Sequence, residues 1–269
     1  MLKQRIMTAL ILAPLLLGAI FLLPNHWFAL FLALPVMLGA SEWANLMGHE
    51  QEGQRVPFVV AVGVLISLCY WFSLKFVVLL GVAWWIAAFF LVKAYPDRVA
   101  QWESRNIRFV IGLLILVPAW LALVMLQGQP HGPYWVMYVM FLVWGADTGA
   151  YFVGRQFGKA KLAPAVSPGK SIAGLWGGVA TTFLIALGVA VLTDAAQPVG
   201  IILFLLISML AVFASVLGDL AESMFKRHRG IKDSSQLLPG HGGILDRIDS
   251  VTAAAPVFVG CMYLLGGVV

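Results

Sequence analysis

Charged residues are scarce in this sequence. They make up 11% of its 269 residues, whereas about 25% is usual for a soluble globular domain. Apolar residues make up 61%, above the usual share of about 45–50%. This composition argues against a water-soluble fold.

Cysteine is also scarce. The two cysteines, Cys69 and Cys261, both lie within apolar segments. A disulfide framework and a zinc site of paired cysteines are therefore excluded. The sequence has no detectable internal repeat, and no stretch is long enough for a separate soluble domain. We therefore predict a single membrane domain over residues 1–269.

Apolar segments dominate what is present. They run for about 17 to 20 residues between short polar breaks, which is the length that crosses a bilayer as a helix. The breaks define nine candidate spans: 6–23, 27–47, 57–73, 76–92, 107–126, 134–154, 172–192, 199–220 and 250–268. Only Ser73, Leu74 and Lys75 separate the third span from the fourth, so eight spans is the alternative count. The first segment lacks the cleavage site of a signal peptide, and we treat it as a span.

The basic residues lie on one side of this predicted bundle. If nine helices alternate, every Lys and Arg except Lys75 falls on the side of the N-terminus. Loops on the cytoplasmic side carry such an excess of positive charge. The sequence therefore predicts an all-α integral membrane protein of about nine transmembrane helices. Its N-terminus is cytoplasmic and its C-terminus is periplasmic or extracellular.

Four carboxylates fall within or at the ends of these spans, where a charge is costly unless it has a partner or a function. They are Glu42, Asp147, Asp219 and Glu222, all in the predicted cytoplasmic half. For Glu42 we favour a structural role, as an acid paired with a nearby Lys or Arg. A functional role for Glu42 and for Glu222 stays open.

Two pairs of acids occur at helical spacing near the C-terminus. Asp219, Glu222 and Lys226 share one helix face, and Asp246 and Asp249 share another at the start of the last span. Such carboxylates can surround Mg²⁺, which prefers oxygen ligands and shares them with phosphates. A basic loop that only contacts anionic lipid is the alternative, but it explains the cations and not the acids.

A second polar segment runs from residue 154 to residue 174. Its Gly169-Lys170-Ser171 is similar to the end of a P-loop, but Pro164 stands where the leading glycine belongs, so a P-loop is excluded. Another kind of phosphate loop, closing on a helix that begins at Ser171, is compatible with the sequence, because a helix N-terminus offers free amides to an anion.

These motifs resemble a known family. The runs 223–227 (SMFKR), 232–233 (KD) and 239–249 (PGHGGILDRID) closely resemble the signature of the phosphatidate cytidylyltransferase (CDP-diacylglycerol synthase) family. Supporting resemblance extends to 147–151 (DTGAY), 154–155 (GR) and 167–171 (SPGKS). One departure is Ala173, where relatives often carry a polar or acidic side chain.

The resemblance implies an enzyme of the bacterial inner membrane that converts CTP and phosphatidate to CDP-diacylglycerol and pyrophosphate. It implies Mg²⁺ as the cofactor, leaves room for a second, monovalent cation such as K⁺, and implies a homodimer with no nucleic-acid partner. Residues 131–269 then carry an active site that faces the cytoplasm, and residues 1–130 supply scaffold, dimer and lipid contacts.

Roles for individual residues follow from the resemblance and from phosphate chemistry. Asp219 and Asp246 are the leading Mg²⁺ ligands, with Asp249 and Asp147 as further candidates. The cations that hold the triphosphate or the lipid phosphate are Lys226, Arg227, Lys232 and Arg247. His241 either donates to a phosphate or holds the glycine turn. Further substrate-binding residues are Ser167, Lys170, Asp233, Gly242 and Gly243.

Two rival functions remain at this point. A secondary transporter also carries intramembrane acids, but its acids are expected near the middle of the membrane and its chain is expected to have two related halves. Here the acids cluster toward one face, and no repeat is visible. Another lipid-linked CTP transferase or a polyprenol kinase uses the same phosphate chemistry on a different lipid. Only the family signature argues against this second rival.

Overall fold

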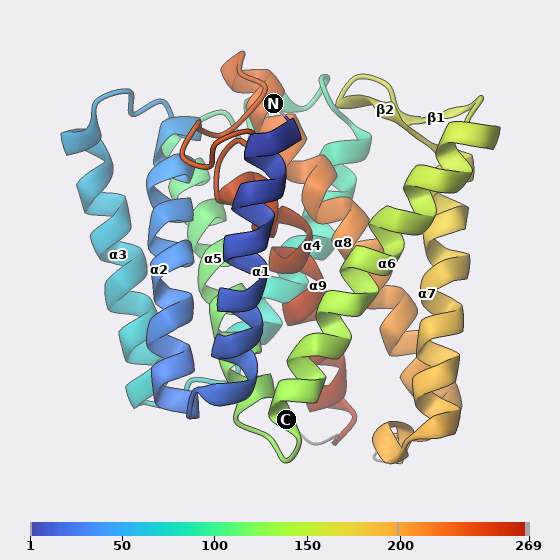
Figure 1. Cartoon of the computed structure of the whole chain (residues 1–269). Helices are drawn as coiled ribbons and strands as arrows, with labels where there is room; N and C mark the ends of the chain where they lie inside the picture. Colours follow the sequence, from blue (N-terminus) through green and yellow to red (C-terminus); the bar gives the residue numbers. More distant parts are fainter. Residues whose placement is uncertain (1, 198, 267–269) are drawn as a thin grey trace.

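The computed structural model describes residues 2–197 and 199–266, which form a bundle of roughly antiparallel helices (Figure 1). Nine α-helices occur within these ranges: α1 (Leu2–Leu22), α2 (Asn25–Leu46), α3 (Glu52–Trp71), α4 (Val77–Lys93), α5 (Arg105–Gln127), α6 (Gly132–Phe157), α7 (Ile172–Leu192), α8 (Ile201–Arg229) and α9 (Leu245–Leu264). Each helix overlaps one candidate span. The third and fourth segments are separate helices, because Ser73 adopts a left-handed backbone conformation (φ 50°) between them.

The two marked ends of the chain lie at opposite ends of the bundle (Figure 1). The α2–α3, α4–α5 and α8–α9 connections lie at the end of the N-terminus, hereafter the polar end (Figure 1). Six of the described helices are long and apolar enough to cross a membrane, namely α2, α3, α5, α6, α7 and α8. The part Leu10–Leu22 of α1 and the helix α4 are shorter apolar segments. The number of spans and the cytoplasmic orientation of the polar end stay predictions.

Small residues set the closest helix contacts. A Cβ at Gly149 of α6 would lie 2.6 Å from the carbonyl oxygen of Gly177, and one at Gly178 of α7 would lie 2.7 Å from that of Ala146. A Cβ at Gly218 of α8 would overlap the carbonyl oxygen of Asp249 in α9. Helices in lipid associate through such close backbone contacts. They fix α6 against α7 and α8 against α9 beside the predicted site residues.

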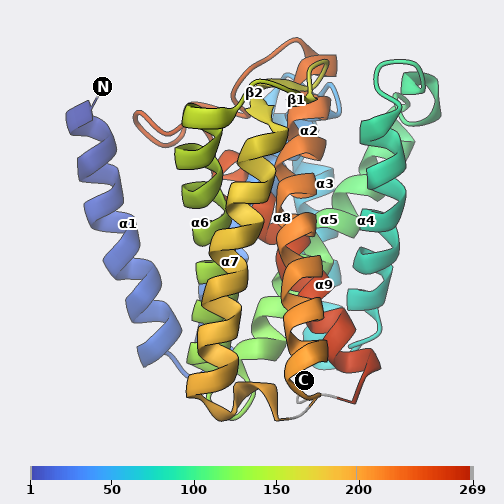
Figure 2. The ribbon, with the colours of Figure 1, turned by 90° about the vertical axis from the view of Figure 1, so that its right-hand side faces the viewer.

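Helix α9 is central, with Ala253, Ala255, Phe258 and Val259 fully buried. By contrast, α1 stands apart from the other helices (Figure 2). Its Leu10, Ile11 and Leu15 are exposed, as expected for side chains that face lipid.

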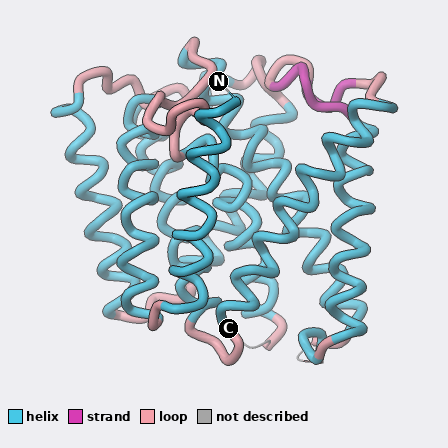
Figure 3. Tube along the Cα trace, in the orientation of Figure 1, coloured by secondary structure: helices cyan, strands magenta, loops and turns pink. Residues whose placement is uncertain are grey.

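A short antiparallel hairpin precedes α7 at the polar end, drawn in magenta in Figure 3. It pairs β1 (Lys161–Ala163) with β2 (Ser167–Ser171), and Lys161 lies opposite Ser171. The sequence predicted a loop here and not a hairpin. The predicted helix start at Ser171 is confirmed, because the Ser171 hydroxyl accepts a hydrogen bond from the Gly174 amide at 3.1 Å.

Candidate active site

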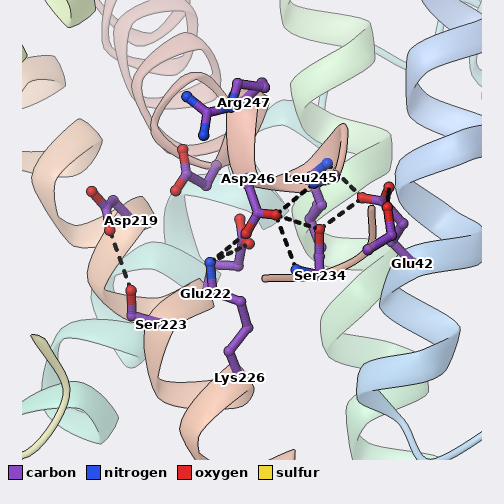
Figure 4. A network of polar contacts seen from close by, with 12 residues as sticks. Glu42, Asp219, Glu222, Ser223, Lys226, Ser234, Leu245, Asp246 and Arg247 are labelled. Carbon is purple, nitrogen blue, oxygen red and sulfur yellow. Dashed lines mark hydrogen bonds and ion pairs between the residues drawn. The ribbon is translucent and has the colours of Figure 1, made fainter. Parts of the chain in front are cut away.

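Asp246 lies at the centre of a hydrogen-bonded cluster at the polar end (Figure 4). Its Oδ1 contacts the Lys226 Nζ at 2.5 Å. Its Oδ2 accepts hydrogen bonds from the amides of Ser234 at 2.9 Å and Gly243 at 2.8 Å. The bond from the Gly243 amide spans three residues, so residues 243–246 form a tight turn at the start of α9. Lys226, Gly243 and Asp246, which the sequence assigns to one candidate site, therefore lie together.

Lys226 is buried and contacts two carboxylates. Besides Asp246, its ammonium group pairs with Glu222 Oε1 at 2.9 Å, one helical turn away on α8. An ammonium has three protons, so these two contacts leave one for a phosphate oxygen. The buried Glu222 Oε2 has no hydrogen-bond partner among the described residues. Glu222 borders a cavity of about 10 Å³, which Asp249 and Thr252 also line.

The second polar segment contacts a different acid of α8, Asp219. Lys170 Nζ at the end of β2 pairs with Asp219 Oδ2 on α8 at 2.7 Å. The Ser223 hydroxyl donates to Asp219 Oδ1 at 3.3 Å. This ion pair links the hairpin to α8, although nearly fifty residues separate Lys170 from Asp219. Both groups also interact electrostatically with Asp249 of α9.

A cavity of about 390 Å³ lies beside this ion pair, between α6, α7, α8 and the hairpin. Asp147, Arg155 and Lys170 line its polar part, and Val179 and Val212 are among its apolar lining residues. Asp147 interacts electrostatically with Lys170, Asp219 and Arg247. The cavity thus has charged groups of both signs beside an apolar wall.

Asp219 and Asp249 lie beside a close contact between α8 and α9. The carbonyl oxygen of Asp249 touches Gly218, and the two carboxylates lie close enough to repel each other. Two acids on facing helices offer the oxygen ligands that Mg²⁺ prefers. Among the described residues, no three acidic, His or Cys side chains form a ready-made metal cage. This arrangement fits an ion that takes its remaining ligands from phosphates and water.

The remaining predicted residues surround this centre in different ways. Arg247 holds the glycine turn, because its Nε donates to the carbonyl of His241 at 3.0 Å. The Nε of Arg227 donates to the carbonyl of Val166 in the hairpin at 3.3 Å. The Nδ1 of His241 is buried without a partner among the described residues. Lys232 and Asp233 are exposed in the α8–α9 loop.

The remaining positions belong to the backbone frame of the site. Ser167 begins β2 opposite Ala163. Gly242 has a left-handed backbone (φ 81°), which a glycine adopts without strain. The roles that the sequence assigns to these side chains stay predictions.

Glu42 requires a correction. The sequence favoured pairing with a nearby Lys or Arg, but none of the described partners of this carboxylate is a cation. Its buried oxygens accept hydrogen bonds from the side chains and backbone of the α8–α9 loop. Ser234 and Ser235, which donate to it, were not identified from the sequence. An acid within an apolar span indicates that a partner exists. The sequence does not identify that partner, because the donors lie about 190 residues away along the chain.

Comparisons with known proteins show what this chain is similar to. A sequence model described as "Cytidylyltransferase family" matches residues 3–265. A protein named phosphatidate cytidylyltransferase from Pseudomonas aeruginosa is 52% identical over 268 residues, covering 99% of this chain and 98% of that protein. One of the same name from Haemophilus influenzae is 41% identical, covering 96% of this chain and 97% of that protein. One from Staphylococcus epidermidis is 43% identical over 131 residues, 49% of this chain and 50% of that protein.

Proposed function

This chain belongs to the cytidylyltransferase family, and we propose that it transfers the CMP group of CTP to phosphatidate. The products are CDP-diacylglycerol and pyrophosphate. The observation that carries this proposal is the convergence of Lys226, Gly243 and Asp246 at one point, in a chain that matches its relatives over nearly their full length. A transporter is not supported, because these relatives carry the name of a transferase.

The reaction joins one phosphate to another. An oxygen of the phosphatidate phosphate attacks the α-phosphorus of CTP, a new P–O–P bond forms, and the bond to pyrophosphate breaks. The attacking phosphate is already anionic at neutral pH, so a strong general base is not needed. Catalysis then rests on positioning and on neutralising the phosphate charge.

We assign each substrate to one side of the site. The cavity between α6, α7 and α8 suits the lipid phosphate, because Lys170 and Arg155 stand beside an apolar wall. The α8–α9 loop suits the triphosphate, because Lys232 and Arg247 flank its glycines, whose amides can approach a phosphate closely. Lys226 lies between the two sides and can contact the phosphate that is transferred.

Mg²⁺ is the proposed cofactor. Asp219 and Asp246 are the leading ligands, and Asp249 and Asp147 are further candidates. Oδ1 of Asp246 accepts a hydrogen bond from the Lys226 ammonium. A carboxylate oxygen has a second lone pair, which can serve a cation. When bound, Mg²⁺ neutralises charge on the triphosphate and on the leaving pyrophosphate. A second, monovalent cation beside it is part of the same proposal.

The setting of the reaction is also a proposal. The polar end carries the basic loops, so we place it at the cytoplasmic face of a bacterial inner membrane. There a lipid substrate that stays in the bilayer meets a nucleotide that stays in water. A homodimer is proposed as the assembly.

The test uses purified protein in detergent and CTP labelled in the α-phosphate. Label should enter the organic phase only when phosphatidate and Mg²⁺ are both present. Label that enters with a different lipid phosphate but not with phosphatidate would favour the rival lipid acceptor. Folded protein that transfers no label to any lipid would refute the proposed activity.

A further inference from the structure

A buried carboxylate from the N-terminal half of the chain reaches the loop that begins α9. Glu42 lies on α2 and is only 5% exposed. Figure 4 shows its side chain directed at Ser234 and at the backbone of Leu245. The mechanism above assigns it no role. Burying a carboxylate without a paired cation is costly, so several hydrogen bonds have to offset the lost hydration.

Four hydrogen bonds reach the two oxygens of Glu42. Oε1 accepts from the Ser235 hydroxyl at 2.6 Å and from the Ile244 amide at 3.0 Å. Oε2 accepts from the Leu245 amide at 2.7 Å and from the Ser234 hydroxyl at 2.9 Å. The Ile244 and Leu245 amides belong to the N-terminus of α9, where a negative charge also interacts favourably with the helix dipole. Glu42 thus binds both ends of the 234–245 loop, the two serines at its start and the two amides at its end.

Ser234 connects Glu42 to the catalytic centre. Its hydroxyl lies 2.9 Å from Glu42 Oε2 and also 2.9 Å from Asp246 Oδ2. A hydroxyl has one proton, so it donates fully to only one carboxylate at a time. When a cation takes electron density from Asp246, the proton can turn to Glu42 and no donor is left unpaired.

The space between these groups admits no side chain. A Cβ at Gly243 would overlap the Ser234 hydroxyl and would lie 2.6 Å from Glu42 Oε2. The turn that brings the Gly243 amide to Asp246 is therefore packed directly on Glu42. Any shift of the Glu42 carboxylate changes the position of this turn.

We propose that Glu42 is a positioning residue, which holds the 234–245 loop and, through Ser234, sets the orientation of the Asp246 carboxylate. This inference rests on the proposed function, in which Asp246 binds Mg²⁺ and the loop binds the triphosphate. Outer partners of a metal ligand typically contribute about 10- to 100-fold to metal affinity or activity. Residues 1–130 then supply part of the active site as well as scaffold.

Hydrogen exchange tests the first half of this proposal without substrate or metal. In Glu42→Gln an NH₂ group replaces one oxygen and faces an amide donor, so the Ile244 and Leu245 amides should exchange at least about 10-fold faster, which corresponds to about 1.4 kcal/mol. The matched control is Glu50→Gln. Glu50 pairs with Arg229 at 2.7 Å at the same end of the bundle, but its side chain is 75% exposed.

Kinetics test the second half. Glu42→Gln and the milder Ser234→Ala should raise the Mg²⁺ concentration for half-maximal activity by about 10-fold or more, with little change in the KM for phosphatidate. Ser234→Ala keeps the Leu245 bond to Glu42, so it separates the link to Asp246 from the folding of the loop. Glu50→Gln should leave both quantities unchanged.

Three results would overturn the proposal. One is loop exchange and Mg²⁺ dependence both within twofold of the unmodified protein in Glu42→Gln. Another is faster exchange in all helices alike, which indicates general destabilisation. The third is an equal change in the Mg²⁺ concentration for half-maximal activity and in the KM for phosphatidate. If the unmodified protein transfers no label, the proposed function fails instead, and the exchange experiment still tests the contact between Glu42 and the loop.

Discussion

Asp246 illustrates how a single carboxylate can connect several parts of a site. It contacts a cation from α8 and two backbone amides of the loop before α9. Each partner is a donor, so the charge of Asp246 is what holds them together. A neutral side chain of the same shape keeps the packing and loses this attraction.

The first prediction follows from that charge. Asp246→Asn should reduce transfer of label by at least about 100-fold, because a metal ligand and the partner of Lys226 are both lost. The variant should still insert and fold, as measured by its thermal transition in detergent. Asp97→Asn, at an exposed position of the α4–α5 loop, serves as the control and should remain active. Substantial activity of Asp246→Asn would refute the ligand assignment.

The second prediction concerns the space beside Asp246. Gly243→Ala places a methyl group against the Ser234 hydroxyl and the Glu42 carboxylate. Overpacking of this kind costs about 1–3 kcal/mol, and here it also displaces the amide that binds Asp246. We expect a lower thermal transition and loss of activity. The control is Gly53→Ala, in which the added methyl meets no described atom within 4 Å. An equal loss of stability and activity in Gly53→Ala would show that the effect does not come from the space beside Asp246.

At the scale of elements, the hairpin connects α7 to α8 through one ion pair. The side chains of Lys170 and Asp219 are 26% and 32% exposed, so their attraction is partly screened by solvent. We therefore expect Lys170 to contribute more to binding a phosphate than to folding. Its place at the edge of the cavity favours the lipid phosphate as that ligand.

The third prediction uses this difference. Lys170→Met should raise the KM for phosphatidate by at least about 10-fold, because a charged hydrogen bond to phosphate is worth about 1.5–3 kcal/mol. The thermal transition should change little. Lys93→Met, at an exposed position of the polar end, is the control. A KM for phosphatidate that stays the same in Lys170→Met would move the lipid phosphate to another part of the site.

The sequence predicts the helices well and the contacts between distant loops poorly. Apolar runs of the right length identify each helix, and the spacing of Asp219, Glu222 and Lys226 places these residues on one face. The hairpin was missed because its five-residue strand β2, with Pro and Gly inside, has no alternating pattern. The donors of Glu42 were missed because they lie about 190 residues away, and no local pattern indicates such a contact.

At the scale of the whole molecule, the distribution of charge predicts orientation. The structure separates the α2–α3 loop and the α7–α8 connection to opposite ends of the bundle (Figure 1). The first lies at the basic polar end and the second at the end of the C-terminus. If the polar end is cytoplasmic, these two connections face different compartments.

The fourth prediction tests that orientation. Single cysteines are introduced by Gln51→Cys or Gln197→Cys, both at exposed positions, in a chain that also carries Cys69→Ala and Cys261→Ala. An impermeant maleimide should label Gln197→Cys in intact cells and Gln51→Cys only after permeabilisation. Retained transfer activity shows that each variant is folded. The reverse labelling pattern would invert the topology and place the active site outside.

The contact between Glu42 and the α8–α9 loop also has a consequence for biosynthesis. Its partners are made about 190 to 200 residues later, which takes roughly 10–40 s at typical rates of translation. During that interval the growing chain carries an acid whose future donors do not yet exist. Glu42 lies near the polar end of α2, where water at the membrane surface can solvate it. We therefore expect the candidate site to assemble last, when α9 inserts and its first amides replace that water.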